Sequence, residues 1–210
     1  MTHILLIRHG ESLWNREGRL QGNSDSPLTE TGMRQAQLLA RHLAQLKFAA
    51  LYSSDSGRAL ETARAVSALT GHEIIVDTGL RERHFGVFEG LTRAELESLH
   101  PEAYACFRTR DPAYCIPGGE SALAFSERAL KCLNDIAVRH AGDTVVVVTH
   151  GLVLDVMYRN AYQIALTEPR TFELVHAGVN RLQCAAGRWR VHVWGDADHL
   201  NDTDAGKKVR

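Results

Sequence analysis

A histidine flanked by arginine and glycine stands directly after an apolar run near the start of the chain, in the segment Arg8-His9-Gly10-Glu11. A neutral imidazole is a nucleophile near neutral pH, and arginine offers a fork of donors that fits phosphate oxygens. Glycine lets the backbone come close to a ligand. The segment therefore has the parts needed for attack on phosphorus, although an isolated histidine is more often a hydrogen-bonded loop residue.

A second histidine-glycine pair and a second arginine could serve the same chemistry. His150-Gly151 follows a β-branched run at residues 144–148, which is the strongest strand pattern in the chain. Arg58 could hold phosphate oxygens as a preorganised cation. Its alternative is a helix-surface ion pair with Glu61, which would contribute only about a few tenths of a kcal/mol.

Glu82 is the candidate proton donor, and Glu11 is the competing carboxyl group. A general acid needs a raised pKa, which partial burial and a neighbouring phosphate anion both produce. Arg81 and Arg83 would oppose that shift if they pointed inward. The alternative, in which both side chains point outward into solvent, is at least as favoured, since arginine side chains are mostly exposed.

Apolar runs and helical periodicity predict the elements that position these residues. Strands are predicted at residues 3–7, 49–52, 73–76, 144–148, 172–176, 181–185 and 189–194. Helices are predicted at residues 29–46, 58–69, 93–100, 120–139 and 152–164. Strands that alternate with helices indicate an α/β fold with a doubly wound, mostly parallel sheet and helices on both faces. Ligands bind such sheets beyond the carboxyl ends of the strands, where two strands here end in histidine-glycine.

The domain organisation is predicted to be simple. Residues 1–200 are expected to form one catalytic α/β domain. Glycines and prolines interrupt the stretch at about 86–119, which we interpret as a cap inserted into that domain. Residues 201–210 are polar and are expected to form a tail.

The motifs together resemble those of the histidine phosphatase superfamily, to which the cofactor-dependent phosphoglycerate mutases belong. The segment from Leu6 to Asn15 is similar to the R-H-G-[ET]-x-x-x-N signature, and residues 51–63 are similar to the second-arginine motif. Residues 80–92 resemble the acid motif and residues 147–151 the second-histidine motif, in the family's order. The resemblance covers residues 4 to about 155, is closest to the small phosphatase branch, and implies the phosphoglycerate mutase-like fold.

The resemblance implies a role for each residue singled out above. His9 would become a phosphohistidine, Glu82 would act as general acid and then base, and Arg8, Arg58 and His150 would hold the phosphoryl oxygens. Glu11 is less suited to the proton role, because the family pattern varies between Glu and Thr there. We expect substrate contacts from Asn15, Gln21, Gly22, Gly151, Arg93, Arg108 and Arg110. The last three could instead form a basic, solvated cap surface.

The acceptor of the phosphoryl group separates the function classes. Water gives a phosphatase, whereas a substrate hydroxyl gives a phosphoglycerate mutase, which alone would need 2,3-bisphosphoglycerate as primer. Hydrolysis is favoured because the chain is short between Glu82 and His150. Compared with the mutase branch, Phe85 replaces a Tyr, Arg93 replaces a Lys, and Arg108 and Arg110 replace an adjacent arginine pair. A third reading, an inactive phospho-ligand or protein-binding module, is disfavoured because no catalytic residue is lost.

Composition excludes several partners and cofactors. The formal net charge of −1 argues against a nucleic-acid binder, and no apolar run is long enough for a membrane span. The N-terminus lacks a signal-peptide pattern, so a cytoplasmic location is expected. We predict no metal or other cofactor and four buried, structural cysteines. His84 and His176 are expected to be structural, and His199 with its nearby aspartates is not expected to bind a metal. The expected partner is a small phosphorylated metabolite. A homo-oligomer is compatible with the sequence.

Overall fold

The computed structural model describes residues 1–201, and a six-stranded sheet with the order β3-β2-β4-β1-β5-β6 forms its centre. The first four strands in this order are parallel, whereas β5 runs antiparallel to β1 and β6 antiparallel to β5. Their bounds are β1 Thr2–Arg8, β2 Ala50–Ser53, β3 Ile74–Val76, β4 Thr144–Thr149, β5 Val179–Ala185 and β6 Arg188–Asp196. The predicted α/β fold with a mostly parallel sheet is confirmed.

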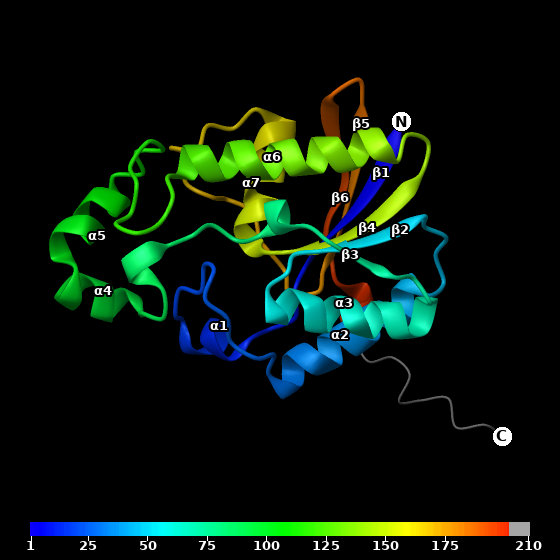
Figure 1. Cartoon of the computed structure of the whole chain (residues 1–210), viewed down its shortest axis with the longest axis horizontal. Coiled ribbons are helices and arrows are strands. Elements are labelled where there is room, and N and C mark those ends of the chain that lie inside the picture. The colour runs from blue at the N-terminus through cyan, green and yellow to red at the C-terminus, as the bar shows by residue number, and fades with distance from the viewer. Residues whose placement is uncertain (202–210) are drawn as a thin grey trace.

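Helices cover both faces of this sheet (Figure 1). Helices α2 and α3 pack on one face and α6 and α7 on the other. The helices are α1 Leu13–Glu17, α2 Glu30–Leu43, α3 Gly57–Thr70, α4 Arg93–Leu99, α5 Pro101–Arg108, α6 Ala122–Arg139 and α7 Gly151–Tyr162. Within residues 1–201, no helix is both long and apolar enough to cross a membrane.

The central strand β1 is apolar from Ile4 to Ile7 because this stretch is buried on both faces. Ile4 and Leu6 belong to the apolar cluster beneath α6 and α7, and Leu5 and Ile7 to the cluster beneath α2 and α3. Successive side chains of a strand point to opposite faces, so two helical layers require a continuous apolar run. β4 alternates in the same way, and it pairs with β1 in a register that places Arg8 opposite Thr149 at the carboxyl ends of the two strands.

Helices α4 and α5 lie at one end of the molecule, away from the sheet (Figure 1). They enclose a separate apolar cluster formed by Phe85, Phe88, Leu96 and Ile116. Only α4 was predicted; α5 begins at Pro101, a favourable first helical position because proline's missing N–H has no helical partner to lose there.

Two structural predictions were wrong. Residues 172–176 do not form a strand, and only His176 makes an isolated bridge to Arg8. Phe172 instead stacks on Tyr158 with ring centroids 3.8 Å apart, so the apolar alternation of this segment reflects packing of a loop. Among the cysteines, the two in the region of α4 and α5, Cys106 and Cys115, are exposed, whereas Cys132 and Cys184 are buried as expected. Positions 202–210 of the predicted tail lie outside the described residues.

Candidate active site

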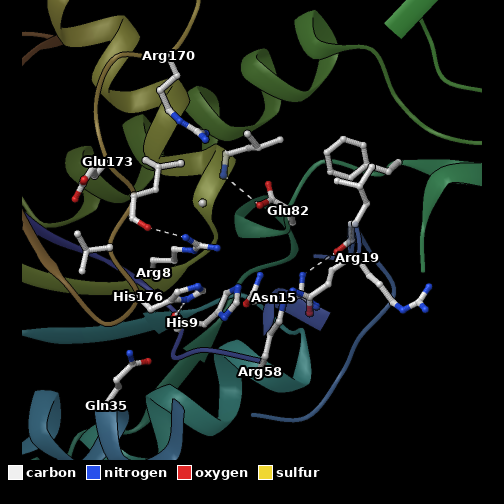
Figure 2. Close-up of a pocket in the computed structure, with 18 of the residues that line it drawn as sticks. Arg8, His9, Asn15, Arg19, Gln35, Arg58, Glu82, Arg170, Glu173 and His176 are labelled. Atoms are coloured by element: carbon white, nitrogen blue, oxygen red, sulfur yellow. Dashed lines mark hydrogen bonds between the residues drawn. The ribbon is translucent and has the colours of Figure 1, made fainter. Parts of the chain in front are cut away.

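A cavity of about 830 Å³ opens at the carboxyl ends of β1 and β4 (Figure 2). It is the place where a doubly wound sheet binds ligands, because the loops that follow parallel strands meet there. Most of the predicted site residues line it, namely Arg8, His9, Asn15, Gln21, Gly22, Arg58, Glu82 and Gly151.

His9 is buried directly after β1 and is oriented by its own loop. Its Nδ1 lies 2.7 Å from the carbonyl oxygen of Gly10. A carbonyl can only accept, so this contact assigns the ring proton to Nδ1 and leaves the Nε2 lone pair available. Burial lowers the pKa of His9 well below 6.5, and the neighbouring His150, Arg58 and Arg8 lower it further. The imidazole is therefore neutral, as a nucleophile must be.

His150 stands beside His9 at the end of the adjacent strand β4. The two ring centroids are 5.2 Å apart, and the rings meet edge to face. His150 Nε2 lies 2.8 Å from the Ser54 hydroxyl, whereas its buried Nδ1 has no hydrogen-bond partner within residues 1–201. Burial lowers the pKa of His150 well below 6.5, with Arg58 and Arg8 acting in the same direction.

Arg8 and Arg58 flank the histidines as buried or half-buried cations. Arg8 Nη1 donates to the carbonyl of Leu174 at 2.6 Å, and Arg58 Nη1 pairs with Asp25 at 2.7 Å. Arg58 thus pairs with Asp25 and not with Glu61. Burial lowers the pKa of Arg8 to about 10, so it stays a cation at neutral pH. The Nε atoms of both guanidinium groups are buried and make no hydrogen bond within the described chain.

Glu82 enters the cavity from the segment that follows β3. Its two oxygens accept from the backbone N–H groups of Arg83 at 2.9 Å and Leu152 at 3.1 Å. Burial raises the pKa of Glu82 above 4.5 and outweighs these hydrogen bonds and the cations Arg58 and Arg8, which lower it. Burial thus produces the direction of shift that a general acid requires.

The charged neighbours of Glu82 differ in part from expectation. Arg81 pairs with Asp55 and remains partly exposed, but Arg83 is buried rather than solvated. Arg83 donates to the carbonyl of Glu120 at 3.1 Å and lies over the rings of Phe85 and Phe107, which replace its hydration. Glu11, the competing carboxyl group, accepts from Thr29 Oγ1 at 2.7 Å, so it is committed to the start of α2.

The neutral residues predicted to bind substrate have structural partners as well. The Ser12 hydroxyl lies 2.9 Å from both Asn15 Oδ1 and Gln21 Oε1 and donates its single proton to one of them, while the Ser12 backbone N–H donates to Asn15 Oδ1 at 3.2 Å. The Asn15 amide nitrogen is thereby left as the donor side of that group. The carbonyl of Gly22 accepts from Arg58 Nη2 at 2.8 Å. Gly151 begins α7, where a side chain would approach Arg8 Nε to 3.4 Å.

The structure does not bring Arg93, Arg108 and Arg110 to the cavity. All three are exposed on or next to α4 and α5, and Arg110 donates to the carbonyl of Glu168 at 3.1 Å. Helices at the far end of the molecule direct these side chains to solvent. None of the three lines the cavity, and their contact with substrate stays a prediction.

Sequence reasoning also missed residues that line the cavity. His176, expected to be structural, donates from Nδ1 to the His9 carbonyl at 3.0 Å and also lines the cavity. Arg170 lies on the same loop (Figure 2). Neither belongs to a local motif. The one available signal was the apolar alternation at 172–176, which marks the loop between them.

Comparison with known proteins shows the family of the chain. The chain matches the family model of the histidine phosphatase superfamily (branch 1) over residues 4–197. The chain belongs to the histidine phosphatase superfamily. Residues 4–197 include His9, Glu82, His150 and all of the strands except the first two residues of β1.

Similar members of the superfamily carry different names. The chain is 39% identical to Phosphoglycerate mutase-like protein 4 of Arabidopsis thaliana, over 96% of this chain and 88% of that protein. It is 37% identical to Metal-independent phosphoserine phosphatase, also of Arabidopsis thaliana, over 96% and 84%. The solved structure of Bacillus stearothermophilus YhfR is similar with a TM-score of 0.88 and 37% identity, covering 95% of this chain and all of that one.

Proposed function

We propose that this histidine phosphatase hydrolyses a phosphomonoester of a small metabolite through a phosphohistidine on His9. One observation carries the proposal: Arg8 Nε, Arg58 Nε and His150 Nδ1 are buried beside His9 without a hydrogen-bond partner in residues 1–201. Buried polar groups are normally paired, so donors left in this state around a nucleophile indicate a bound anion. A phosphoryl group supplies the oxygens that these atoms would bind.

The first step transfers the phosphoryl group to the enzyme. His9 Nε2 forms a bond to phosphorus while the bond from phosphorus to the ester oxygen breaks. Glu82 acts in its protonated form, which burial favours by raising its pKa, and gives its proton to the leaving oxygen. Arg8, Arg58 and the Nδ1 proton of His150 bind the equatorial oxygens, where negative charge accumulates.

The second step regenerates the enzyme. Glu82, now a carboxylate, takes a proton from water as the water oxygen attacks phosphorus and the P–N bond to His9 breaks. Inorganic phosphate leaves, His9 is neutral again and Glu82 is protonated for the next cycle. The cations Arg8 and Arg58 supply the countercharge in both steps, and we therefore propose that no metal or other cofactor takes part.

A phosphoglycerate mutase is the second candidate, because one of the similar proteins is named phosphoglycerate mutase-like. Two observations favour hydrolysis. Phe85, which lines the cavity, offers no hydroxyl to a substrate, and the arginines near α4 and α5 lie outside the cavity. The similar protein named as a phosphoserine phosphatase supports the same choice.

The test offers the purified protein a panel of phosphomonoesters, and 3-phosphoglycerate with and without 2,3-bisphosphoglycerate. We expect release of inorganic phosphate, an acid-labile phosphohistidine, and loss of both in His9→Ala. Isomerisation to 2-phosphoglycerate with little release of phosphate would establish the mutase instead. Absence of both activities and of the phosphohistidine would support the inactive binding module.

The proposed absence of a metal gives a separate prediction. We expect the rate of phosphate release to be unchanged after exhaustive treatment with EDTA, since the cations that bind the phosphoryl group are side chains. Loss of activity with EDTA and its recovery with a divalent ion would contradict the proposal.

The cap formed by residues 86–119, a cytoplasmic location and a homo-oligomer stay predictions.

A further inference from the structure

Two arginines of the cavity, Arg19 and Arg170, are not used by the mechanism. Arg170 lies on the loop between α7 and β5 and lines the cavity. In Figure 2 its guanidinium group points from this loop toward the side of the cavity that holds Arg8 and Glu82. Its charge reaches the phosphate end, since Arg170 is among the groups that lower the pKa of Arg8.

The guanidinium group of Arg170 is only weakly neutralised by the protein. The acid paired with it, Asp155, is 3.9 Å away, and the other oxygen of Asp155 is bound by Arg159 at 2.6 Å. No hydrogen bond to the Arg170 side chain is formed within residues 1–201. Glu173, on the same loop, is exposed and points away from the Arg170 guanidinium in Figure 2.

Arg19, the remaining arginine of the cavity, shows the contrasting state. It donates to Glu95 at 2.7 Å and to the carbonyl of Gly90 at 2.7 Å, and it also pairs with Glu17. Its guanidinium group is thus committed to the rim of the cavity. Arg170 keeps its planar fork of donors available, and that fork matches a carboxylate in two parallel hydrogen bonds.

We propose that Arg170 binds a second anionic group of the substrate, a carboxylate, so that the enzyme selects phosphomonoesters that carry one. The inference rests on the proposed function. Leu152, Phe172 and Leu174 line the same cavity and offer apolar surface to the carbon chain between the two anions. A substrate with both a phosphate and a carboxylate would also reduce the repulsion between Arg8 and Arg170. A substrate with a neutral hydroxyl in place of the carboxylate would not.

The experiment compares substrates that differ only in the carboxylate. The pairs are 3-phosphoglycerate with glycerol 3-phosphate, and O-phosphoserine with O-phosphoethanolamine. We expect the wild type to favour the carboxylate of each pair about tenfold or more in kcat/KM, as charge-assisted hydrogen bonds imply. Arg170→Met should abolish the preference, and Arg170→Lys, which keeps the charge but not the fork, should retain part of it.

Arg188→Met is the matched control, because Arg188 is exposed on β6 and does not line the cavity; its preference should equal that of the wild type. Equal rates for both members of each pair in the wild type, or a preference that survives in Arg170→Met, would overturn the inference. A higher rate with 2,3-bisphosphoglycerate than with 3-phosphoglycerate, lost in Arg170→Met, would overturn the assignment of a carboxylate and show that Arg170 binds a second phosphate.

Failure of the proposed function is measured separately. Hydrolysis of 4-nitrophenyl phosphate reports on His9 without a carboxylate, and thermal unfolding shows whether each variant is folded. If no ester is hydrolysed, calorimetry with His9→Ala still decides the inference. Tighter binding of 3-phosphoglycerate than of glycerol 3-phosphate, lost when Arg170→Met is added, supports it, and equal binding overturns it.

Discussion

Burial has opposite chemical consequences for His9 and Glu82, the two residues that exchange charge in the proposed reaction. It disfavours the charged form of each group, so the pKa of His9 falls and the pKa of Glu82 rises. Burial therefore favours the neutral form of His9 and the protonated form of Glu82 at the same time. A nucleophile and an acid are thus available together without a strong base in the site.

Glu82→Gln tests the proton role through the leaving group. For an alkyl phosphate we expect a loss of about 10²–10⁴-fold in kcat, the usual contribution of general acid catalysis. For 4-nitrophenyl phosphate, whose leaving group needs no proton, the loss should be much smaller. In the wild type, kcat for the alkyl ester should fall as pH rises through the raised pKa of Glu82. Equal losses for both esters would remove Glu82 from the acid role.

Ser54 is predicted to position His150. Its hydroxyl lies 2.8 Å from Nε2, and if it donates there, the ring proton stays on the buried Nδ1 beside the phosphoryl site. Ser54→Ala should lower kcat/KM about tenfold, the effect of one lost hydrogen bond to a reacting group. Ser54→Thr, which keeps the hydroxyl, should recover the rate. A similar rate for Ser54→Ala and wild type would exclude this role.

At the scale of elements, the site is assembled from strand ends and from loops that are fixed by distant contacts. The strand ends were predictable, because the apolar runs before His9 and His150 are local patterns and the sheet brings their carboxyl ends together. Arg170 and Arg83 were not predictable from local patterns, since Arg170 pairs with Asp155, and Arg83 contacts Glu120 and the ring of Phe107. The same reason explains the error at 172–176, where a loop replaces the predicted strand.

The loop before α2 gives a prediction for Gly22. A Cβ at Gly22 would lie 2.1 Å from Glu89 Oε1, and its φ of +57° disfavours other residues. Glu89 also binds the backbone N–H groups of Asn23 and Ser24, so the displaced loop would move the carbonyl that binds Arg58. We expect Gly22→Ala to lower both the Tm and kcat/KM, the latter at least tenfold, or about 1.4 kcal/mol.

Gly18→Ala is the matched control for this prediction. Gly18 also has a positive φ of +71°, but nothing lies within 4 Å of the position of its Cβ. Its substitution should cost only the backbone strain, on the order of 1 kcal/mol of unfolding free energy, and leave the activity unchanged. Equal effects of the two variants on kcat/KM would show that the contact with Glu89 does not matter.

For the whole molecule, neutral buried histidines make stability depend on pH. Burial lowers the pKa of His9 and His150 well below 6.5 and that of His176 to about 4. At a pH between a histidine's lowered folded-state pKa and its unfolded-state pKa of about 6.5, the unfolded chain binds more protons than the folded chain. The free energy of unfolding therefore falls as pH falls below about 6.5. Glu82 acts in the opposite direction between its raised pKa and 4.5, but it is one group against three.

We expect urea unfolding to show this slope between about pH 6.5 and 5, with each histidine contributing up to about 1.4 kcal/mol per pH unit. His176→Asn should flatten the slope by one such contribution. His3→Asn is the control, because His3 is exposed and its replacement should leave the slope as it is. A slope that is unchanged in His176→Asn would contradict the assignment of a neutral His176 in the folded protein.

The pairing of β1 between β4 and β5 also has a consequence for synthesis on the ribosome. β1 is synthesised first, whereas its neighbours β4 and β5 belong to the last third of the chain. The apolar residues of β1 therefore stay unpaired during most of translation. Long-range strand pairing is slow and leaves such segments open to aggregation or to chaperones. His9 and His150 come together only when β1 pairs with β4. The recovery of phosphohistidine formation during refolding would therefore report that this pairing has formed, and a chain that ends before β4 would be inactive.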